Sequence, residues 1–193
     1  MKNTINYYEK HAKEFCQQTI NVDMSSIQDI FLMYLSKDAY ILDAGCGSGR
    51  DSLFFLSRGY KVMAMDGSKQ ICEEAEKLLK QSVLNLNFSE IDFEEEFDGI
   101  WACASLLHVS KNDIEDVLNK LYDSLKKNGI LYASFKYGES EHVVDEKLYN
   151  DYNEDALQAL FLKTSFNIKE IFVTQDNVPG RISPKWINII VQK

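Results

Sequence analysis

The hydrophobic positions of this chain form short apolar runs that alternate with longer amphipathic stretches up to about residue 136. Apolar runs of about four to eight residues are typical of buried strands, whereas apolar residues recurring every three or four positions indicate helices. The pattern predicts strands at 40–44, 61–66, 86–91, 97–103 and 129–136. It predicts helices at 5–17, 25–35, 50–58, 68–81 and 111–127. Strands that alternate with helices favour an α/β fold whose sheet is buried on both faces.

The pattern changes after residue 137. One more helix is predicted at 152–165, and two strands at 167–175 and 185–193 enclose a connector that holds both prolines, Pro179 and Pro184. This arrangement suits a long antiparallel hairpin and brings the expected strands to seven. Because no repeat or linker interrupts the chain, we expect one domain over 1–193, with a helical segment at 1–36 before a core at 37–193.

A glycine-rich loop follows the first predicted strand. The segment "DAGCGSG" places Gly45, Gly47 and Gly49 where the chain leaves that strand. Glycine has no Cβ, so such a turn lets the backbone approach a ligand. Asp66 ends the next strand, 21 residues after Gly45, where a carboxylate can accept hydrogen bonds from ribose hydroxyls. The dinucleotide fingerprint requires glycine at position 50, which here is Arg50, so the pattern favours a different nucleoside ligand.

The order D-x-G-x-G-x-G resembles the first motif of class I S-adenosylmethionine-dependent methyltransferases. Later motifs of that family resemble "MDGS" (65–68), "EIDF" (90–93), "FDGIWACASLLHV" (97–109) and "LKKNGILYASFKYGE" (125–139). The resemblance implies a Rossmann-like, seven-stranded, mostly parallel sheet with helices on both faces and an antiparallel last strand. It also implies S-adenosyl-L-methionine as cofactor, with S-adenosyl-L-homocysteine as product. Within the family, the chain is most similar to small-molecule enzymes of the tellurite-resistance and thiopurine methyltransferase type.

The resemblance assigns cofactor contacts to the glycine loop, the ends of the second and fourth strands, and an adenine-binding turn. In that turn Asp92 is expected near the exocyclic amine and Phe93 beside the ring. The implied cofactor-binding residues are Tyr8, Asp43, Gly45, Cys46, Gly47, Asp66, Gly67, Ser68, Asp92, Phe93 and Ala102. Simpler roles stay open for several: a capping carboxylate for Asp43, a small filler for Cys46, an exposed acidic turn for Asp92 and a core position for Phe93.

The acceptor side is predicted from fewer residues. His108 follows the fourth strand, where the resemblance places the donor methyl group, and an imidazole there can orient an acceptor or take its proton. Its alternative role is a hydrogen bond to nearby backbone. Lys136 and Tyr137 at the end of the fifth strand, with Arg181 in the connector, are expected to meet an anionic acceptor. The 1–36 segment is expected to act as a lid that brings Tyr8 to the cofactor, unless its aromatic residues only pack.

Composition narrows the partners. The 30 acidic and 21 basic residues give a net charge of −9, which disfavours binding to nucleic acid phosphates. No apolar run reaches the ~18 residues of a membrane span, and the spacing of the four cysteines indicates reduced thiols and no metal site. We therefore expect a cytoplasmic monomer or homodimer that methylates a small molecule. A tRNA or DNA methyltransferase and a catalytically silent cofactor-binding module remain as alternatives.

Overall fold

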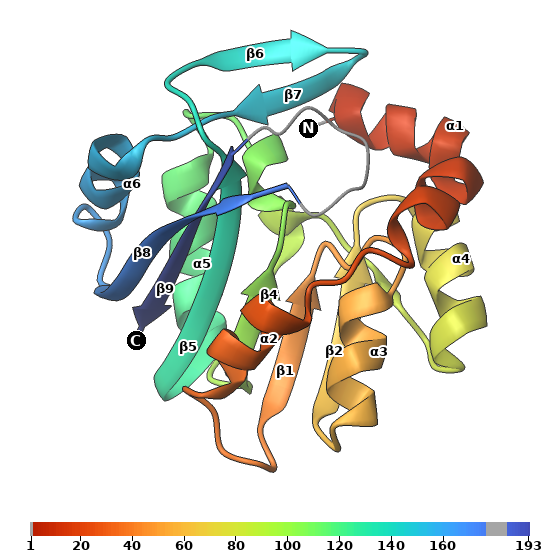
Figure 1. The fold of residues 1–193 in the computed structure, drawn as a ribbon, viewed down its shortest axis with the longest axis horizontal. Coiled ribbons are helices and arrows are strands. Elements are labelled where there is room, and N and C mark those ends of the chain that lie inside the picture. The colour runs from red at the N-terminus through yellow and green to blue at the C-terminus, as the bar shows by residue number, and fades with distance from the viewer. Residues whose placement is uncertain (1, 177–184) are drawn as a thin grey trace.

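A seven-stranded sheet forms the centre of the computed structural model, which describes residues 2–176 and 185–193 (Figure 1). Its strand order is β3-β2-β1-β4-β5-β9-β8. The strands are β1 (Tyr40–Ala44), β2 (Lys61–Asp66), β3 (Leu84–Asn85), β4 (Phe97–Ala102), β5 (Leu125–Lys136), β8 (Asn167–Gln175) and β9 (Lys185–Gln192). β1 to β5 run parallel, whereas β9 pairs antiparallel with both β5 and β8. The Rossmann-like, mostly parallel sheet with an antiparallel last strand is thus confirmed.

Helices cover both faces of this sheet. They are α1 (Lys2–Thr19), α2 (Ser25–Leu32), α3 (Arg50–Ser57), α4 (Lys69–Leu79), α5 (Ile114–Ser124) and α6 (Glu154–Phe161). On one face Phe31 of α2 and Phe55 of α3 pack in one apolar cluster with Trp101 of β4, and on the other Leu118 of α5 packs in a cluster that includes Ile100. Adjacent strand residues point to opposite faces, and this double burial explains the continuous apolar runs.

The first helix lies at the edge of the sheet where the parallel strands end. Ala12 and Cys16 of α1 pack with Ile71 of α4, and the Thr4 hydroxyl oxygen accepts a hydrogen bond from the Leu148 amide (3.0 Å). Leu148 belongs to a separate two-stranded hairpin of β6 (Glu141–Val144) and β7 (Lys147–Asn150). In Figure 1 this hairpin lies above the start of α1. Helix α1 is therefore held between α4 and the hairpin.

The expected strand at 86–91 was wrong. Only Leu84–Asn85 pairs with β2, and the chain then forms a short 3-10 helix, η1 (Phe88–Glu90). The Glu90 carboxylate accepts a hydrogen bond from the Asn87 amide (2.9 Å). Such a local side-chain hydrogen bond competes with the hydrogen bonds of a sheet. Residues 86–91 therefore form a turn, although their alternating apolar pattern is typical of a strand.

Two further differences concern strand ends and turns. The strand expected at 129–136 begins already at Leu125, and α5 therefore ends at Ser124 instead of residue 127. The added part of the strand is held to β4 by an ion pair between Lys126 and Asp98 (3.0 Å). The β6–β7 hairpin was not expected at all. Its turn residues Asp145 and Glu146 both have positive φ angles (49° and 66°), a conformation usually indicated by Asn-Gly or Asp-Gly.

Across the two described ranges, no helix is long and apolar enough to cross a membrane.

Candidate functional site

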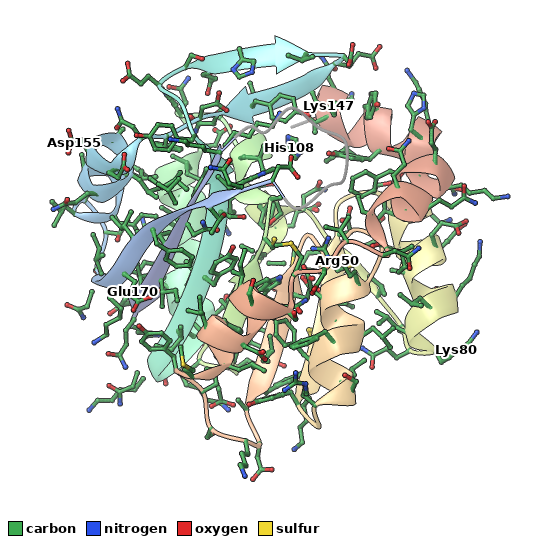
Figure 2. All side chains as sticks on the ribbon, viewed as in Figure 1. Arg50, Lys80, His108, Lys147, Asp155 and Glu170 are labelled. Atoms are coloured by element: carbon green, nitrogen blue, oxygen red, sulfur yellow. The ribbon has the colours of Figure 1, made fainter. Side chains whose placement is uncertain are left out.

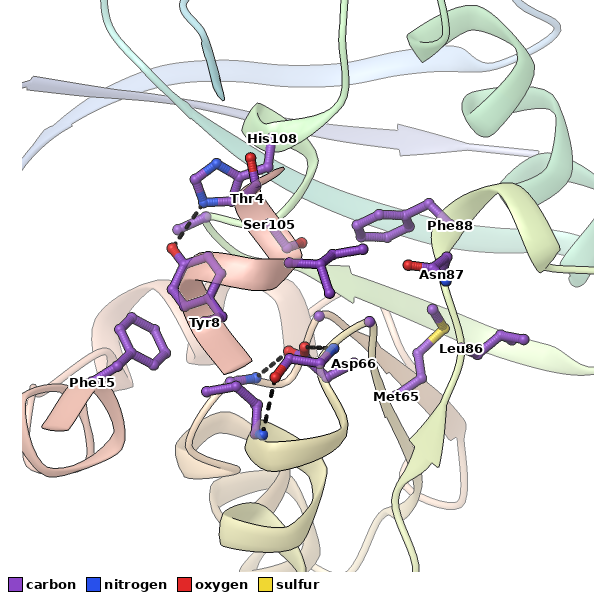
Figure 3. Close-up of a pocket in the computed structure, with 17 residues that line it drawn as sticks. Thr4, Tyr8, Phe15, Met65, Asp66, Leu86, Asn87, Phe88, Ser105 and His108 are labelled. Carbon is purple, nitrogen blue, oxygen red and sulfur yellow. Dashed lines mark hydrogen bonds between the residues drawn. The ribbon is translucent and has the colours of Figure 1, made fainter. Parts of the chain in front are cut away.

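Two cavities meet at the glycine loop between β1 and α3. The smaller has a volume of about 100 Å³ and the larger about 360 Å³. Both are lined by Tyr8 and Phe15 of α1, by Gly45 and Gly47 of the loop, and by Ala104 and His108 after β4. Figure 3 shows the smaller cavity, with Tyr8 reaching toward His108 and Asp66 beneath. Such a site, where parallel strands end in a crevice, is the usual ligand position in open α/β sheets.

The glycine loop has a backbone that other residues cannot adopt at low cost. Gly45 and Gly47 have φ angles of +85° and +53°. A Cβ on Gly45 would lie 2.5 Å from the Ser105 Cβ, and one on Gly47 would lie 3.3 Å from the Phe15 ring. The Gly45 and Cys46 amides both donate to the Met65 carbonyl of β2 (2.9 Å each). The loop is thus fixed to the neighbouring strand with no side chain between its glycines and the cavities.

Asp66 lies at the end of β2, as predicted, and lines the smaller cavity. Its carboxylate accepts hydrogen bonds from the Gly47 amide (3.2 Å) and the Ser68 amide (2.9 Å). Burial raises its pKa to about 6, although these backbone hydrogen bonds favour the ionised form. Gly67 and Ser68 line the same cavity, and the Ser68 hydroxyl caps α4 by accepting from the Ile71 amide (3.3 Å). Asp66 therefore connects the glycine loop to the start of α4.

The turn beside Asp66 is formed by Leu86, Asn87 and Phe88, all of which line the smaller cavity. The side-chain Nδ2 atom of Asn87 donates to the Glu90 carboxylate (2.7 Å). The side-chain Oδ1 atom of Asn87 is buried without a hydrogen-bond partner among the described residues. A buried acceptor that lacks a partner costs free energy and calls for an explanation. A ligand that donates a hydrogen bond into the smaller cavity would satisfy this oxygen.

Four residues expected at the cofactor line neither cavity. Asp92 is exposed, and Phe93 packs edge-on against Phe97 with ring centroids 5.2 Å apart. Because the 3-10 turn comes earlier than the expected strand end, Asn87 and Phe88 occupy the cavity wall instead. Ala102 is fully buried in the core, since it still belongs to β4. Asp43 accepts a hydrogen bond from the Ser52 hydroxyl (2.6 Å), which joins the end of β1 to α3.

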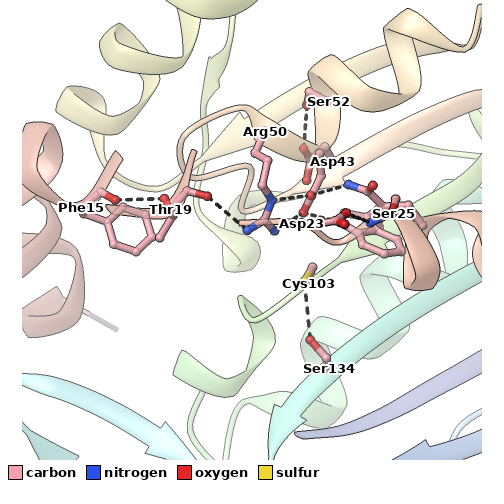
Figure 4. Close-up of polar contacts among 12 residues, drawn as sticks. Phe15, Thr19, Asp23, Ser25, Asp43, Arg50, Ser52, Cys103 and Ser134 are labelled. Atoms are coloured by element: carbon pink, nitrogen blue, oxygen red, sulfur yellow. Dashed lines mark hydrogen bonds and ion pairs between the residues drawn. The ribbon is translucent and has the colours of Figure 1, made fainter. Parts of the chain in front are cut away.

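Arg50 and Asp51 form a buried ion pair at the start of α3 and line the larger cavity (Figure 4). Asp51 accepts from the Arg50 Nε and Nη2 atoms (2.7 and 2.8 Å), the Gln28 amide (2.7 Å) and the Trp101 indole (2.9 Å). Arg50 also donates to the Thr19 carbonyl at the end of α1 (3.5 Å). The pair thereby joins α1, α2, α3 and β4 at one point.

His108 lies where the two cavities meet, and both of its ring nitrogens have partners. Nδ1 lies 2.6 Å from the Leu148 carbonyl, so it carries the proton, and Nε2 accepts from the Tyr8 hydroxyl at 3.0 Å. Burial, together with the nearby ammonium groups of Lys147 and Lys136, lowers the pKa of His108 to about 4. A neutral imidazole whose basic nitrogen is already engaged is a poor proton acceptor.

The other predicted residues divide between the larger cavity and the surface. Cys46 and Lys136 line that cavity. Tyr137 does not; it is 40% exposed, and its hydroxyl donates to Glu154 (2.7 Å). Neighbouring strand residues face opposite sides, so Lys136 and Tyr137 could not both face it. Arg181 lies outside the described residues.

Sequence reasoning missed several residues that line the cavities. Asn87 and Phe88 carried a detectable signal, because a polar residue and a ring follow closely after a strand neighbouring Asp66. Lys147 and Tyr149 come from the β6–β7 hairpin, and Trp186 from β9. Their approach to the glycine loop depends on tertiary structure that no local pattern encodes.

Comparisons with known proteins agree with this geometry. Residues 41–129 match the family model described as a methyltransferase domain. YqeM of Bacillus subtilis, which is named as a methyltransferase, is 29% identical over 132 residues, covering 63% of this chain and 52% of that protein. The chain thus spans about half the length of this relative.

Solved structures with the same fold include a didemethyltoxoflavin methyltransferase and TehB. The 1,6-didemethyltoxoflavin-N1-methyltransferase of Burkholderia thailandensis, solved with 1,6-didemethyltoxoflavin and S-adenosylhomocysteine, has a TM-score of 0.84 at 20% identity and covers 100% of this chain and 88% of its own. TehB of Haemophilus influenzae has a TM-score of 0.73 at 14% identity, with 94% and 66% covered. At these identities the likeness concerns the fold.

Proposed function

We propose that this chain is an S-adenosylmethionine-dependent methyltransferase that transfers the methyl group of its cofactor to a small-molecule acceptor, which its match to a methyltransferase domain over residues 41–129 supports. The observation that carries the proposal is the meeting of two cavities at the glycine loop, with a carboxylate in the smaller one. The larger cavity, about 360 Å³, is at the lower end of the range for small-ligand pockets. The toxoflavin enzyme offers a neighbour whose structure holds such an acceptor.

Residues that line the smaller cavity would bind the adenosine part of S-adenosylmethionine. The Asp66 carboxylate would accept hydrogen bonds from the ribose hydroxyls, and the unpartnered Asn87 oxygen would accept from the exocyclic amine of adenine. Phe88 and Leu86 supply apolar surface for the base. The glycine loop leaves room for the rest of the cofactor, because a Cβ at Gly45 or Gly47 would narrow the space beside it.

The first helix acts as the lid of this site. Thr4, Ile5 and Tyr8 of α1 line the smaller cavity, so residues 1–36 would shield the cofactor and exclude water from the transfer. We assign His108 a positioning role: by accepting from the Tyr8 hydroxyl it fixes that ring over the site. Because the sulfonium of S-adenosylmethionine is itself a good leaving group, alignment is the chain's main contribution.

The cofactor assignment is tested by thermal unfolding. S-adenosylmethionine and S-adenosylhomocysteine should each raise Tm, since a ligand that binds only the native state stabilises it by mass action, whereas NAD should not. A larger shift with NAD would contradict the assignment. Formation of S-adenosylhomocysteine with a panel of metabolites would then exclude a catalytically silent module.

The acceptor class is tested against nucleic acid. The net charge of −9 supports a small acceptor, and the four free thiols support our proposal of a cytoplasmic location. With S-adenosylhomocysteine present, labelled tRNA and duplex DNA should show no salt-sensitive binding in fluorescence anisotropy. Salt-sensitive submicromolar binding with methyl incorporation would instead favour the tRNA or DNA alternative. Whether the chain is a monomer or homodimer stays a prediction.

Asp66→Ala should weaken S-adenosylhomocysteine binding by about 1.5–3 kcal/mol, because hydrogen bonds to a charged group are lost. This corresponds to about a tenfold to hundredfold higher Kd in calorimetry. Asp92→Ala is the matched control, since it removes an exposed carboxylate that lines neither cavity. Equal Kd values for the two variants would remove Asp66 from the cofactor site.

Affinity for S-adenosylhomocysteine should also fall as pH drops from 7 to 5. The pKa of Asp66 is raised to about 6, so the acceptor carboxylate is mostly ionised above that pH and is progressively lost below it. The Asp66→Asn variant cannot titrate at this position and should give a flatter profile. A native profile as flat as that of the variant would show that another group receives the ribose.

A further inference from the structure

The larger cavity carries a cluster of rings and ammonium groups beyond His108. Lys147 and Tyr149 come from β7, Lys136 from the end of β5, and Tyr7 from α1. The Lys136 Nζ lies 3.9 Å from the centre of the Tyr149 ring, and the Lys147 Nζ lies 4.0 Å from the centre of the Tyr7 ring. Figure 2 shows Lys147 close to His108. Together with Trp186, these side chains form a surface of aromatic faces and positive charge.

Lys136 and Lys147 bring two ammonium groups to the part of the larger cavity formed by β5 and β7, although the whole chain is acidic. Three carboxylates also line the larger cavity: Asp51 is neutralised by Arg50, Glu14 on α1 accepts from Gln18, and Asp176 follows β8. Lys147 forms no ion pair with any described residue. An ammonium group without a carboxylate partner, held over a ring at a cavity wall, is available to an anionic ligand.

We propose that the larger cavity binds the methyl acceptor as a small planar aromatic or heteroaromatic anion, paired with Lys147 and packed against the rings of Tyr149 and Trp186. This inference rests on the proposed function and names its acceptor class. The cavity of about 360 Å³ must also admit the reactive end of the methyl donor, which limits the acceptor to one or two rings. Flat rings pack favourably on aromatic side chains, which an aliphatic acid of similar size cannot do.

An ionised acceptor also explains why the site holds no available base at His108. In the transfer, a lone pair on the acceptor forms a bond to the methyl carbon while the bond between that carbon and sulfur breaks. The electron pair stays on sulfur, so the positive sulfonium and the negative acceptor become a neutral thioether and a neutral product. No proton leaves, and the Tyr8–His108 hydrogen bond can stay intact throughout.

Calorimetry on the full chain saturated with S-adenosylhomocysteine tests the proposal. The probes are nicotinate, 4-hydroxybenzoate and 2-naphthoate, each compared with its neutral amide, and cyclohexanecarboxylate as the aliphatic acid. We expect at least one aromatic acid to bind tenfold or more tightly than both its amide and the aliphatic acid. Lys147→Met should reduce that preference to threefold or less, and Lys147→Arg should retain it. Lys80→Met, which removes an ammonium group far from the cavity (Figure 2), should change nothing.

Each other outcome overturns the proposal. Equal binding of acid and amide would exclude recognition of the charge, and equal binding of cyclohexanecarboxylate would exclude recognition of the ring. Full affinity in a folded Lys147→Met protein would remove Lys147 from the site. If no aromatic acid binds while S-adenosylhomocysteine does, the acceptor class is wrong and the methyltransferase function stands; if S-adenosylhomocysteine itself fails to bind, both are wrong.

Discussion

Asp51→Ala is expected to lower the free energy of unfolding by about 3–5 kcal/mol, the cost of removing one partner from a buried ion pair. Asp51 accepts four hydrogen bonds from three residues, and its side chain is 8% exposed. The substitution leaves the Arg50 guanidinium without its carboxylate and leaves the Gln28 and Trp101 donors without an acceptor. Urea denaturation of native and variant protein measures the difference.

Asp29→Ala is the matched control for that experiment. Asp29 also pairs with an arginine, Arg58 (3.5 Å), but both side chains are about half exposed. Exposed pairs of this kind contribute about 0–1 kcal/mol. Similar losses in the two variants would show that the Arg50–Asp51 pair does not hold α1, α2, α3 and β4 together.

Gly45→Ala should be the most damaging change in the glycine loop. A Cβ there would lie 2.5 Å from the Ser105 Cβ, and overpacking of this kind costs about 1–3 kcal/mol. The positive φ of +85° adds about 1–2 kcal/mol for a residue with a side chain. We expect a loss of unfolding free energy near the sum of both, together with at least a tenfold loss of S-adenosylhomocysteine affinity, because the displaced loop enters the cavities.

Gly59→Ala separates the two contributions. Gly59 has nearly the same φ, +88°, but a Cβ there meets no atom within 4 Å. It should therefore show only the backbone cost and bind S-adenosylhomocysteine as the native protein does. A Gly45→Ala protein that matches Gly59→Ala in both stability and affinity would mean that the close contact with Ser105 has no consequence.

The core of the fold and the glycine loop were predictable because local patterns determine them. The strands ending at Ala44 and Asp66 are largely buried and contain the apolar runs 41–42 and 62–65. Gly45 must be glycine for two independent physical reasons, positive φ and close contact. The position of Asp66 was predictable because a polar residue at the end of a buried strand lies at the edge of the sheet.

The walls of the cavities were less predictable because they are built by contacts between distant segments. Tyr8 and His108 are 100 residues apart in sequence, yet their hydrogen bond engages the nitrogen that the sequence offered as a base. Lys147 reaches the site through a hairpin whose turn, Asp145–Glu146, lacks the usual turn residues. The turn beside Asp66 comes at Asn87, earlier than the expected 90–93, because the Asn87 backbone amide donates to the Glu90 carboxylate and the strand ends early.

The environment of Cys46 would keep its thiol unreactive toward a methyl sulfonium bound at the glycine loop. A methyl sulfonium is an electrophile, and a thiolate beside it would compete with any acceptor. Burial, together with the nearby Asp43 and Asp66 carboxylates, raises the pKa of Cys46 well above its ordinary value. The thiol therefore stays protonated at neutral pH, and the protonated form is a weak nucleophile. The glycine loop therefore contains a sulfur atom that is kept protonated and packed in an apolar cluster with Ala64 and Cys72.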